Sequence, residues 1–202
     1  MGDMPSSLRR VAIASDLPAV DATLVSAFFA DPLWGLWAFP NPLTRSHGLK
    51  QLLHAWSSAA VKHRSVWIAQ NAEAVAAWIP PSEPEMTTAE EHAFDQLAVE
   101  LFGSRAQELQ ALFALFDEHH PHQQPHYYLS LWGTHSDYRG QGLGTALIED
   151  NLARIDAQRM PAYLESTNPA NLPRYEDLGF QPKDTFAPTG GPTITTMWRP
   201  SA

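Results

Sequence analysis

Cysteine is absent from the 202-residue chain. A disulfide framework, a thiolate zinc site and a cysteine nucleophile are therefore excluded, and with them an acyl-cysteine intermediate. Long apolar runs are also lacking. Residues 1–10 contain no apolar segment of the kind found in signal peptides, and no later stretch approaches the roughly 20 apolar residues of a membrane span. We therefore expect a soluble, cytoplasmic protein that has no membrane partner.

Basic residues are scarce, with 13 lysines and arginines against 22 aspartates and glutamates, for a formal net charge of −9. Nucleic-acid binding requires a basic footprint that can neutralise phosphates, so we expect no nucleic-acid partner. An acidic surface attracts cationic small molecules. It is also ordinary solubility chemistry, so the charge alone does not choose between these two readings.

The length and a hydrophobic content of 44% suit one sizeable core, and we expect a single domain over residues 1–202. Residues 28–40 crowd aromatic side chains between prolines and predict a loop or a short buried helix. Apolar periodicity predicts strands at residues 11–13, 65–69, 74–79, 127–132, 162–166 and 193–198. It predicts helices at residues 17–28, 47–62, 87–118 with a break at Gly103, 145–157 and 174–178.

A glycine-rich segment, Arg139-Gly140-Gln141-Gly142-Leu143-Gly144, lies between a predicted strand and a predicted helix. Such a turn gathers backbone N–H groups at the positive end of the helix, which suits a pyrophosphate. No Gly-Lys-Ser/Thr ending is present, which argues against a nucleotide-hydrolysing loop, and the spacing of G-x-G-x-x-G also fails. Glycines can alternatively make a tight turn that binds nothing.

Two linked motifs carry a family resemblance. Arg139, Gly142 and Gly144 match the Q/R-x-x-G-x-G pattern, and Asn171 stands four residues before Tyr175 in a segment that ends in Gly-Phe. The chain therefore resembles the GNAT superfamily of acetyltransferases. Within that superfamily it resembles the puromycin N-acetyltransferase group over nearly its whole length. The matching features are Asp31-Pro32, Val66-Trp67-Ile68-Ala69, Trp78 with Pro80-Pro81, Glu165-Ser166-Thr167, Asn171-Leu172-Pro173, Gly191-Pro192 and Trp198.

The resemblance implies an α/β (α+β) fold, with a central mixed, mostly antiparallel sheet flanked by helices. Two parallel strands, expected at residues 127–134 and 162–166, would splay apart and admit the pantetheine arm of acetyl-CoA. Backbone groups of the first strand would pair with this arm, and we expect Gly133 to form a bulge that frees them. The implied cofactor-binding residues are Trp132, Gly133, Thr134, Arg139, Gly140, Gln141, Gly142, Leu143, Gly144, Thr145 and Asn171.

The resemblance also implies an acetyltransferase mechanism. Tyr175 is the candidate acid that protonates the departing CoA thiolate, although it could instead only pack its helix onto the core. Asn171 could bind pantetheine, cap the helix, or do both. Glu165, at the end of the second splayed strand, is the candidate general base. Substrate-cation binding and a structural ion pair are the alternatives for Glu165, together at least as well supported as base catalysis, and an amine that is already neutral needs no base.

The expected reaction is N-acetylation of a small-molecule amine by direct attack in a ternary complex. O-acetylation, indicated by a pH profile that collapses in Glu165→Gln with an alcohol, and a non-catalytic acyl-CoA-binding module are the alternatives. Peptide acetylation is disfavoured, because residues 28–40 suggest a covered pocket. The sequence leaves open the acceptor, the acyl chain length and whether the chain forms a homodimer.

Two clusters of side chains receive less weight. His119, His120, His122 and His126 lie in a proline-broken loop without an accompanying carboxylate pattern, so we expect no metal site. Turn and core contacts are the favoured roles for these histidines. The tryptophans Trp34, Trp37, Trp56 and Trp78 could line an acceptor pocket or simply fill the core.

Overall fold

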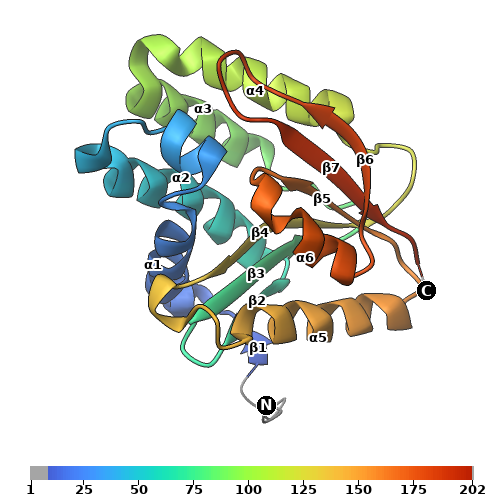
Figure 1. Cartoon of the computed structure of the whole chain (residues 1–202). Coiled ribbons are helices and arrows are strands. Elements are labelled where there is room, and N and C mark those ends of the chain that lie inside the picture. Colours follow the sequence, from blue (N-terminus) through green and yellow to red (C-terminus); the bar gives the residue numbers. More distant parts are fainter. Residues whose placement is uncertain (1–8, 202) are drawn as a thin grey trace.

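The computed structural model describes residues 9–201, so most of the N-terminal segment of residues 1–10 lies outside the described part. Helices and strands are interleaved along the chain, singly or in pairs of the same kind (Figure 1). The strands are β1 (Arg9–Val11), β2 (Val66–Ala69), β3 (Ala74–Ile79), β4 (Tyr127–Thr134), β5 (Ala162–Ser166), β6 (Gln181–Phe186) and β7 (Ile194–Arg199). The helices are α1 (Leu17–Phe28), α2 (Pro42–Lys62), α3 (Thr88–Phe102), α4 (Ala106–His119), α5 (Leu143–Ala157) and α6 (Leu172–Asp177), with a π-helix at Pro32–Trp37.

The strands of the described chain form one seven-stranded sheet in the order β1-β2-β3-β4-β5-β7-β6. All neighbours are antiparallel except β4 and β5. This parallel pair is joined only at Tyr127↔Ala162 and Tyr128↔Tyr163, after which the two strands separate. The mixed, mostly antiparallel sheet with splayed parallel strands is therefore confirmed.

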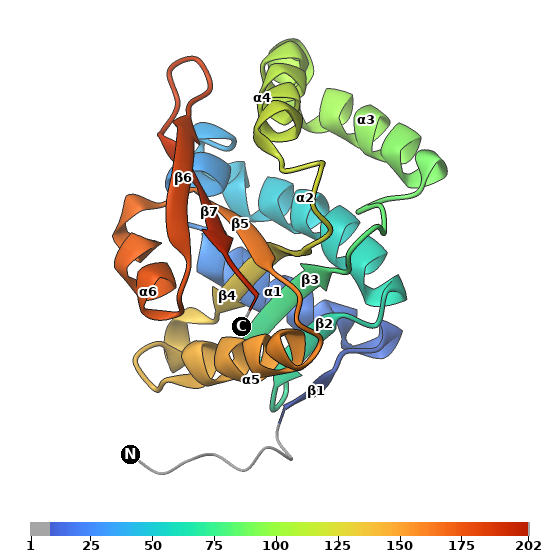
Figure 2. The same cartoon turned by 90° about the vertical axis from the view of Figure 1, so that its right-hand side faces the viewer.

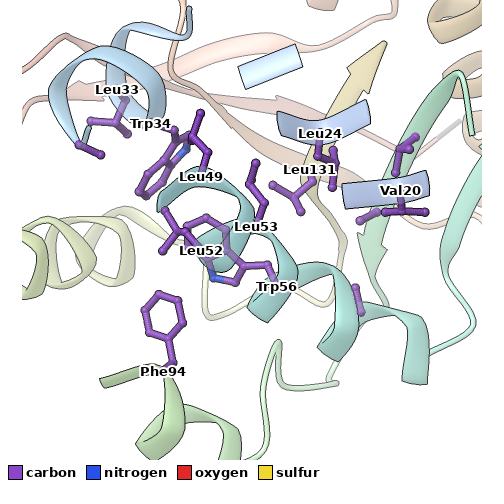
Figure 3. Packing of buried hydrophobic residues seen from close by; sticks show 14 of the residues in the cluster. Val20, Leu24, Leu33, Trp34, Leu49, Leu52, Leu53, Trp56, Phe94 and Leu131 are labelled. Atoms are coloured by element: carbon purple, nitrogen blue, oxygen red, sulfur yellow. The ribbon is translucent and has the colours of Figure 1, made fainter. Parts of the chain in front are cut away.

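One face of the sheet is covered by α1 to α4. Alternate residues of β2 and β3, such as Ile68 and Val75, join a core cluster with Leu24 of α1 and Leu53 of α2. Figure 3 shows leucines of α2 packed close to Trp34 of the π-helix. This covering explains why the predicted aromatic segment of residues 28–40 is buried at Leu33, Trp34 and Gly35.

The other face is covered by α5 and α6, which Figure 2 places on the side away from α3 and α4. Leu147, Ile148 and Leu152 of α5 recur at helical spacing and pack on Ala76 and Trp78 of β3. Because both faces are covered, every residue of β3 is buried, as its apolar sequence requires.

Most predicted elements are present, with shifted ends. The helix predicted at residues 47–62 begins at Pro42, because Asn41 Oδ1 accepts from Leu43 N at 3.0 Å and proline suits a first turn. The helix predicted at residues 145–157 begins at Leu143.

Strand β6 was not predicted from the sequence. It lies at the edge of the sheet and five of its six residues are exposed, so it carries no apolar alternation. Pro182, Lys183 and Asp184 occupy its middle, where its register with β7 is irregular. The opposite edge is β1, which is only three residues long.

The predicted bulge at Gly133 is wrong. Gly133 pairs regularly with Val75, and the irregularity lies where Ala77 pairs with Leu131 and Trp78 with Leu129, which leaves Ser130 as the extra residue. Gly133 has another reason to lack a side chain. A Cβ there would lie 2.6 Å from the Cβ of Ala27, so glycine allows α1 to approach the sheet. Within residues 9–201, no helix is long and apolar enough to cross a membrane.

Candidate functional site

A cavity of about 520 Å³ lies where the glycine segment meets β4, α1 and α6. Its lining includes Tyr175 and all but one of the residues predicted to bind a cofactor. Gln141 is the exception, since it is exposed and does not line the cavity. The predicted residues that line it are Trp132, Gly133, Thr134, Arg139, Gly140, Gly142, Leu143, Gly144, Thr145 and Asn171.

Backbone conformation explains why the segment contains glycines. Gly140 and Gly142 have φ values of 78° and 77°, a left-handed conformation that favours glycine. Gly142 is also the N-cap of α5, and the hydrogen-bond ladder starts with Ala146 N donating to Gly142 O at 3.0 Å. The amides of Leu143, Gly144 and Thr145 therefore precede the ladder and are available to an anion at the helix N-terminus.

Two further features make this cavity suitable for a phosphate-bearing ligand with polar groups along its arm. A Cβ at Gly144 would overlap the Oγ1 atom of Thr134, so glycine brings the start of α5 against β4. The buried indole nitrogen of Trp132 has no hydrogen-bond partner within the described chain, although a buried donor normally requires one. The Trp132 nitrogen is itself inaccessible, so the donors that the cavity presents are the amides of Leu143, Gly144 and Thr145.

The guanidinium of Arg139 contacts the backbone of α1. Its Nη2 atom donates to the carbonyl oxygen of Ala27 at 3.1 Å, near the C-terminal end of α1. The guanidinium thereby holds the glycine segment against α1, where helix carbonyls attract a cation. Arg139 therefore lines the cavity, while its guanidinium makes a hydrogen bond within the protein.

Tyr175 is buried on α6 and contacts the rings of Trp132 and Phe180, with centroids 5.4 and 6.1 Å away. Burial and the nearby Asp31 carboxylate raise the pKa of its phenol, which stays protonated at neutral pH. The neighbouring motif residue, Asn171, is the N-cap of α6 but makes no side-chain cap hydrogen bond. The capping role considered for Asn171 is therefore absent, and its side chain belongs to the cavity wall.

Asp31 is a site residue that sequence reasoning missed. Its Oδ1 atom accepts from the amides of Leu33 and Trp34 at 3.0 and 2.9 Å, and its Oδ2 atom accepts from Thr167 Oγ1 at 2.7 Å. Burial raises the pKa of this carboxyl. An aspartate before proline and an aromatic run is a helix-cap signal, but nothing local indicates that it reaches β5 and Tyr175.

A second cavity, of about 660 Å³, lies between α3, α4 and the sheet. It adjoins a smaller chamber of about 80 Å³ that also contains Thr167, the partner of Asp31. Glu165, the predicted base, lies in both of these spaces and does not line the first cavity. Asp31 lines the first cavity, so the Asp31–Thr167 hydrogen bond joins the walls of the two regions next to the splayed strands.

Glu85 is the other carboxylate that the sequence did not reveal. It follows Pro80-Pro81 in the connection from β3 to α3, and it accepts a short hydrogen bond from Ser130, the bulge residue of β4. Burial and the charge of Glu165 raise the pKa of Glu85. Burial and the carboxylates of Glu165 and Glu85 also raise the pKa of Tyr128. These groups gather only through tertiary contacts, so no local sequence signal could have found them.

The histidine tract makes turn contacts. His119 Nδ1 and His122 Nε2 each lie 2.8 Å from a backbone carbonyl, and His126 Nδ1 lies 2.7 Å from Gln124 O. His120 is different, because its Nδ1 atom lies 3.8 Å from Glu165 Oε1 and it lines the second cavity. Among the described residues, no group of three histidines, aspartates or glutamates is arranged to hold a metal ion.

The tryptophans divide between pocket and other roles. Trp34 and Trp56 line the small chamber, with Trp56 also in the large cavity. Trp37 stacks beneath the guanidinium of Arg105, 5.1 Å away. Trp78 faces α5, where its Nε1 atom donates to Asn151 Oδ1 at 3.0 Å.

Glu85→Gln is expected to raise the melting temperature at about pH 8 by about 2 °C or more. The unfolded chain ionises Glu85 near its ordinary pKa of 4.5, whereas the folded chain keeps the proton to a higher pH. The contribution of Glu85 to the free energy of unfolding therefore falls as the pH rises from the unfolded-state pKa through the higher folded-state pKa. Glutamine cannot ionise, so the variant does not lose this stability. Below about pH 4 the two proteins should melt alike.

The control for this prediction is Glu118→Gln, which removes an exposed carboxylate of α4 and should change the melting temperature little at either pH. Calorimetric scans of the three proteins at both pH values make the comparison. Equal melting temperatures of Glu85→Gln and the parent at about pH 8 would contradict it.

Comparison with known proteins agrees with this geometry. Residues 34–180 match the family described as "Acetyltransferase (GNAT) family". A crystal structure titled histone acetyltransferase HPA2 and related acetyltransferase, from Corynebacterium glutamicum, is 27% identical over 96% of both chains, with a TM-score of 0.68. Two more distant structures share the fold. One is a mosquito arylalkylamine N-acetyltransferase like 5b, which is 16% identical over 95% of this chain and 98% of that one, with a TM-score of 0.67. The other is a Drosophila melanogaster polyamine N-acetyltransferase, which is 16% identical over 95% of this chain and 98% of that one, with a TM-score of 0.61.

The family match covers more than half of the chain, and both linked motifs lie on one cavity beside the splayed strands. The chain therefore belongs to the GNAT family of acetyltransferases and is an acyltransferase.

Proposed function

We propose that the chain is an acetyl-CoA-dependent N-acetyltransferase that acts on a small-molecule amine by direct attack in a ternary complex. The observation that carries the proposal is the pair of cavities beside the splayed strands. One is lined by the glycine segment and Tyr175, and the other by Glu85 and Glu165. Donor and acceptor can thus occupy different spaces at once. The amine substrates named for the two distant relatives support the same class.

The residues divide the chemistry as follows. Acetyl-CoA, when bound, supplies an activated acetyl group, and its pyrophosphate would lie on the amides of Leu143, Gly144 and Thr145. An attacking amine must be neutral, so Glu85 or Glu165 takes its proton. Glu85 suits this role because its raised pKa brings it nearer to the pKa of an amine. Tyr175 holds a proton on its phenol oxygen and gives it to the departing thiolate.

Two other functions would use the same cavities. An O-acetyltransferase needs a stronger base, and it would acetylate an alcohol with a pH profile that collapses in Glu165→Gln. A non-catalytic acyl-CoA-binding module would bind acetyl-CoA without turnover. A buried, protonated tyrosine at the first cavity supports an enzyme over a module. We also propose one domain over the whole chain and a cytoplasmic location, and we retain the narrower resemblance to the puromycin N-acetyltransferase group.

The proposed route predicts sequential kinetics and no acetyl-enzyme. The chain has no cysteine, the most nucleophilic side chain that could carry the acyl group, so we expect the amine to attack while acetyl-CoA is bound. Intact-mass spectrometry after incubation with acetyl-CoA alone should show only the parent mass, and double-reciprocal plots should intersect. A stoichiometric acetyl adduct that passes to an added amine would refute direct attack.

A further inference from the structure

The cavity of about 660 Å³ that we assign to the acceptor has an unusual charge. Among residues 9–201, six carboxylates line it and no lysine or arginine does. The whole chain has 22 acidic and 13 basic residues, so a lining of average composition would hold three or four basic side chains beside six carboxylates. The six carboxylates are Glu83, Glu85, Glu91, Asp95, Asp117 and Glu165.

Three histidines are the titratable cations of the wall. His122 Nε2 lies 3.5 Å from Asp117 Oδ1, so these two groups form an ion pair when the imidazole is protonated. Burial lowers the pKa of His126, which is therefore neutral at physiological pH. The nearest basic group to Glu165 is His120, whose Nδ1 atom is 3.8 Å from Glu165 Oε1, beyond hydrogen-bond length. In the part of the chain that the structure describes, the wall of the cavity thus contains histidines but no permanently charged cation.

Five of the six carboxylates form an inner and an outer group. The sixth, Glu83, lies in the connection from β3 to α3, with its Oε2 atom 3.9 Å from His63 Nδ1. Glu85 and Glu165 are the inner pair, since both also line the small chamber next to Thr167. They are close enough for the charge of Glu165 to affect the ionisation of Glu85. Two neighbouring carboxylates in a poorly hydrated chamber repel each other, and an ammonium placed between them removes that repulsion.

The outer group lies on the two helices that wall the cavity. Glu91 and Asp95 are four residues apart on α3, so they share a face of that helix, and Asp117 lies on α4. None of the three lines the small chamber. A cation at these residues would therefore be held at some distance from the inner pair.

Aromatic side chains connect the two groups. Trp56, Phe113 and Phe116 line both the chamber and the larger cavity. Phe94 packs against this set, with its ring centroid 5.6 Å from that of Trp56 and 5.4 Å from that of Phe113. Such a wall accepts methylene groups by apolar contact and a passing cation by its ring faces.

We propose that the acceptor amine carries a second cationic group, as in an α,ω-diamine or a guanidino-amine. This inference rests on the proposed N-acetyltransferase function and names its substrate class. One ammonium lies between Glu85 and Glu165, where it loses its proton and attacks the acetyl group. The second cationic group is held at Asp95 and Asp117, and the carbon spacer lies along the aromatic wall.

The first test compares 1,6-diaminohexane with hexylamine, which differ by one cationic group at the same chain length. In low salt and at about pH 8, the diamine should have a kcat/KM at least about 10-fold higher, mainly through a lower KM. In Asp95→Asn/Asp117→Asn the KM for the diamine should rise by about 10-fold, while the KM for hexylamine stays near the parent value.

The matched control is Glu100→Gln/Glu118→Gln. It removes the same charge from the same two helices. Glu100 and Glu118 are exposed, as Asp95 and Asp117 are, but they do not line the cavity. This control should leave the diamine preference unchanged, whereas an effect of the general negative field would lower it equally in both variants. Equal losses in the two variants would overturn the assignment of the second subsite.

A binding measurement separates this inference from the proposed function. Calorimetry with CoA present should show 1,6-diaminohexane binding at least about 10-fold more tightly than hexylamine. If neither amine is acetylated and this preference is still found, the proposed function fails and the inference about the cavity stands. Equal affinity for the two amines contradicts the inference. Tighter binding of hexylamine also contradicts it and favours a hydrophobic monoamine as acceptor. No binding of the diamine contradicts it and favours another kind of acceptor.

Discussion

Tyr175→Phe is expected to lower kcat by roughly 100-fold or more while the affinity for acetyl-CoA stays close to that of the parent. The change keeps the ring that packs on Trp132 and Phe180 and removes only the hydroxyl. Burial keeps this phenol protonated, so the variant loses the proton donor proposed for the CoA thiolate. A residue with only a packing role would lose little, because one hydroxyl contributes little to stability.

Tyr138→Phe is the matched control, since Tyr138 lines the same cavity but is 40% exposed. Its kcat should remain within about threefold of the parent, which is under 1 kcal/mol of barrier. Steady-state kinetics with saturating acetyl-CoA, and calorimetric titration with CoA, give the two readouts. A folded Tyr175→Phe enzyme within the same threefold range would remove Tyr175 from the mechanism.

Gly142→Ala is expected to raise the dissociation constant for CoA by about 30-fold. Gly142 lines the cavity and has a φ of 77°, and an added Cβ meets no protein atom within 4 Å, so it stands in open space. We expect the methyl group to compete there with the pyrophosphate. Alanine is also strained at a positive φ, and we expect this strain to change the orientation of the N–H groups that follow residue 142.

Gly190→Ala provides a control of the same kind. Gly190 has a φ of 67°, and its added Cβ also meets nothing within 4 Å, but it does not line the cavity. Both variants should lose about 1–2 kcal/mol of stability from the left-handed backbone. Only Gly142→Ala should lose affinity for CoA, and an unchanged dissociation constant in that folded variant would show that the glycine segment makes a turn without binding phosphate.

Periodicity and backbone signals made much of the fold predictable. Strand β5 and the break between α3 and α4 at Gly103 follow from apolar patterns and one glycine. The glycine segment is a local motif whose backbone geometry depends on its own residues, so its place before α5 could be read from the sequence. Strand β6 could not, because an exposed edge strand has no buried face to impose alternation.

The missing parts of the site depend on contacts between distant residues. Glu85 and Ser130 are 45 residues apart, and Asp31 and Thr167 are 136 apart. Each carboxyl acquires its raised pKa from surroundings that exist only after folding. The role of Gly133 was also hidden, because it depends on a contact with a distant residue. A glycine at a strand end suggested a bulge, whereas its actual cause is the close approach of Ala27 from α1.

The two edge strands of the sheet influence whether copies of this protein associate at high concentration. An edge strand offers unpaired backbone groups that a second chain can join, which is the first step of many aggregates. Within the described residues β1 is three residues long, which offers few backbone groups, and β6 combines Pro182 with Lys183, Asp184 and an irregular register with β7. Edge-to-edge growth is therefore blocked at both ends, so we expect concentrated folded protein to resist fibril formation, with the net charge of −9 adding mutual repulsion.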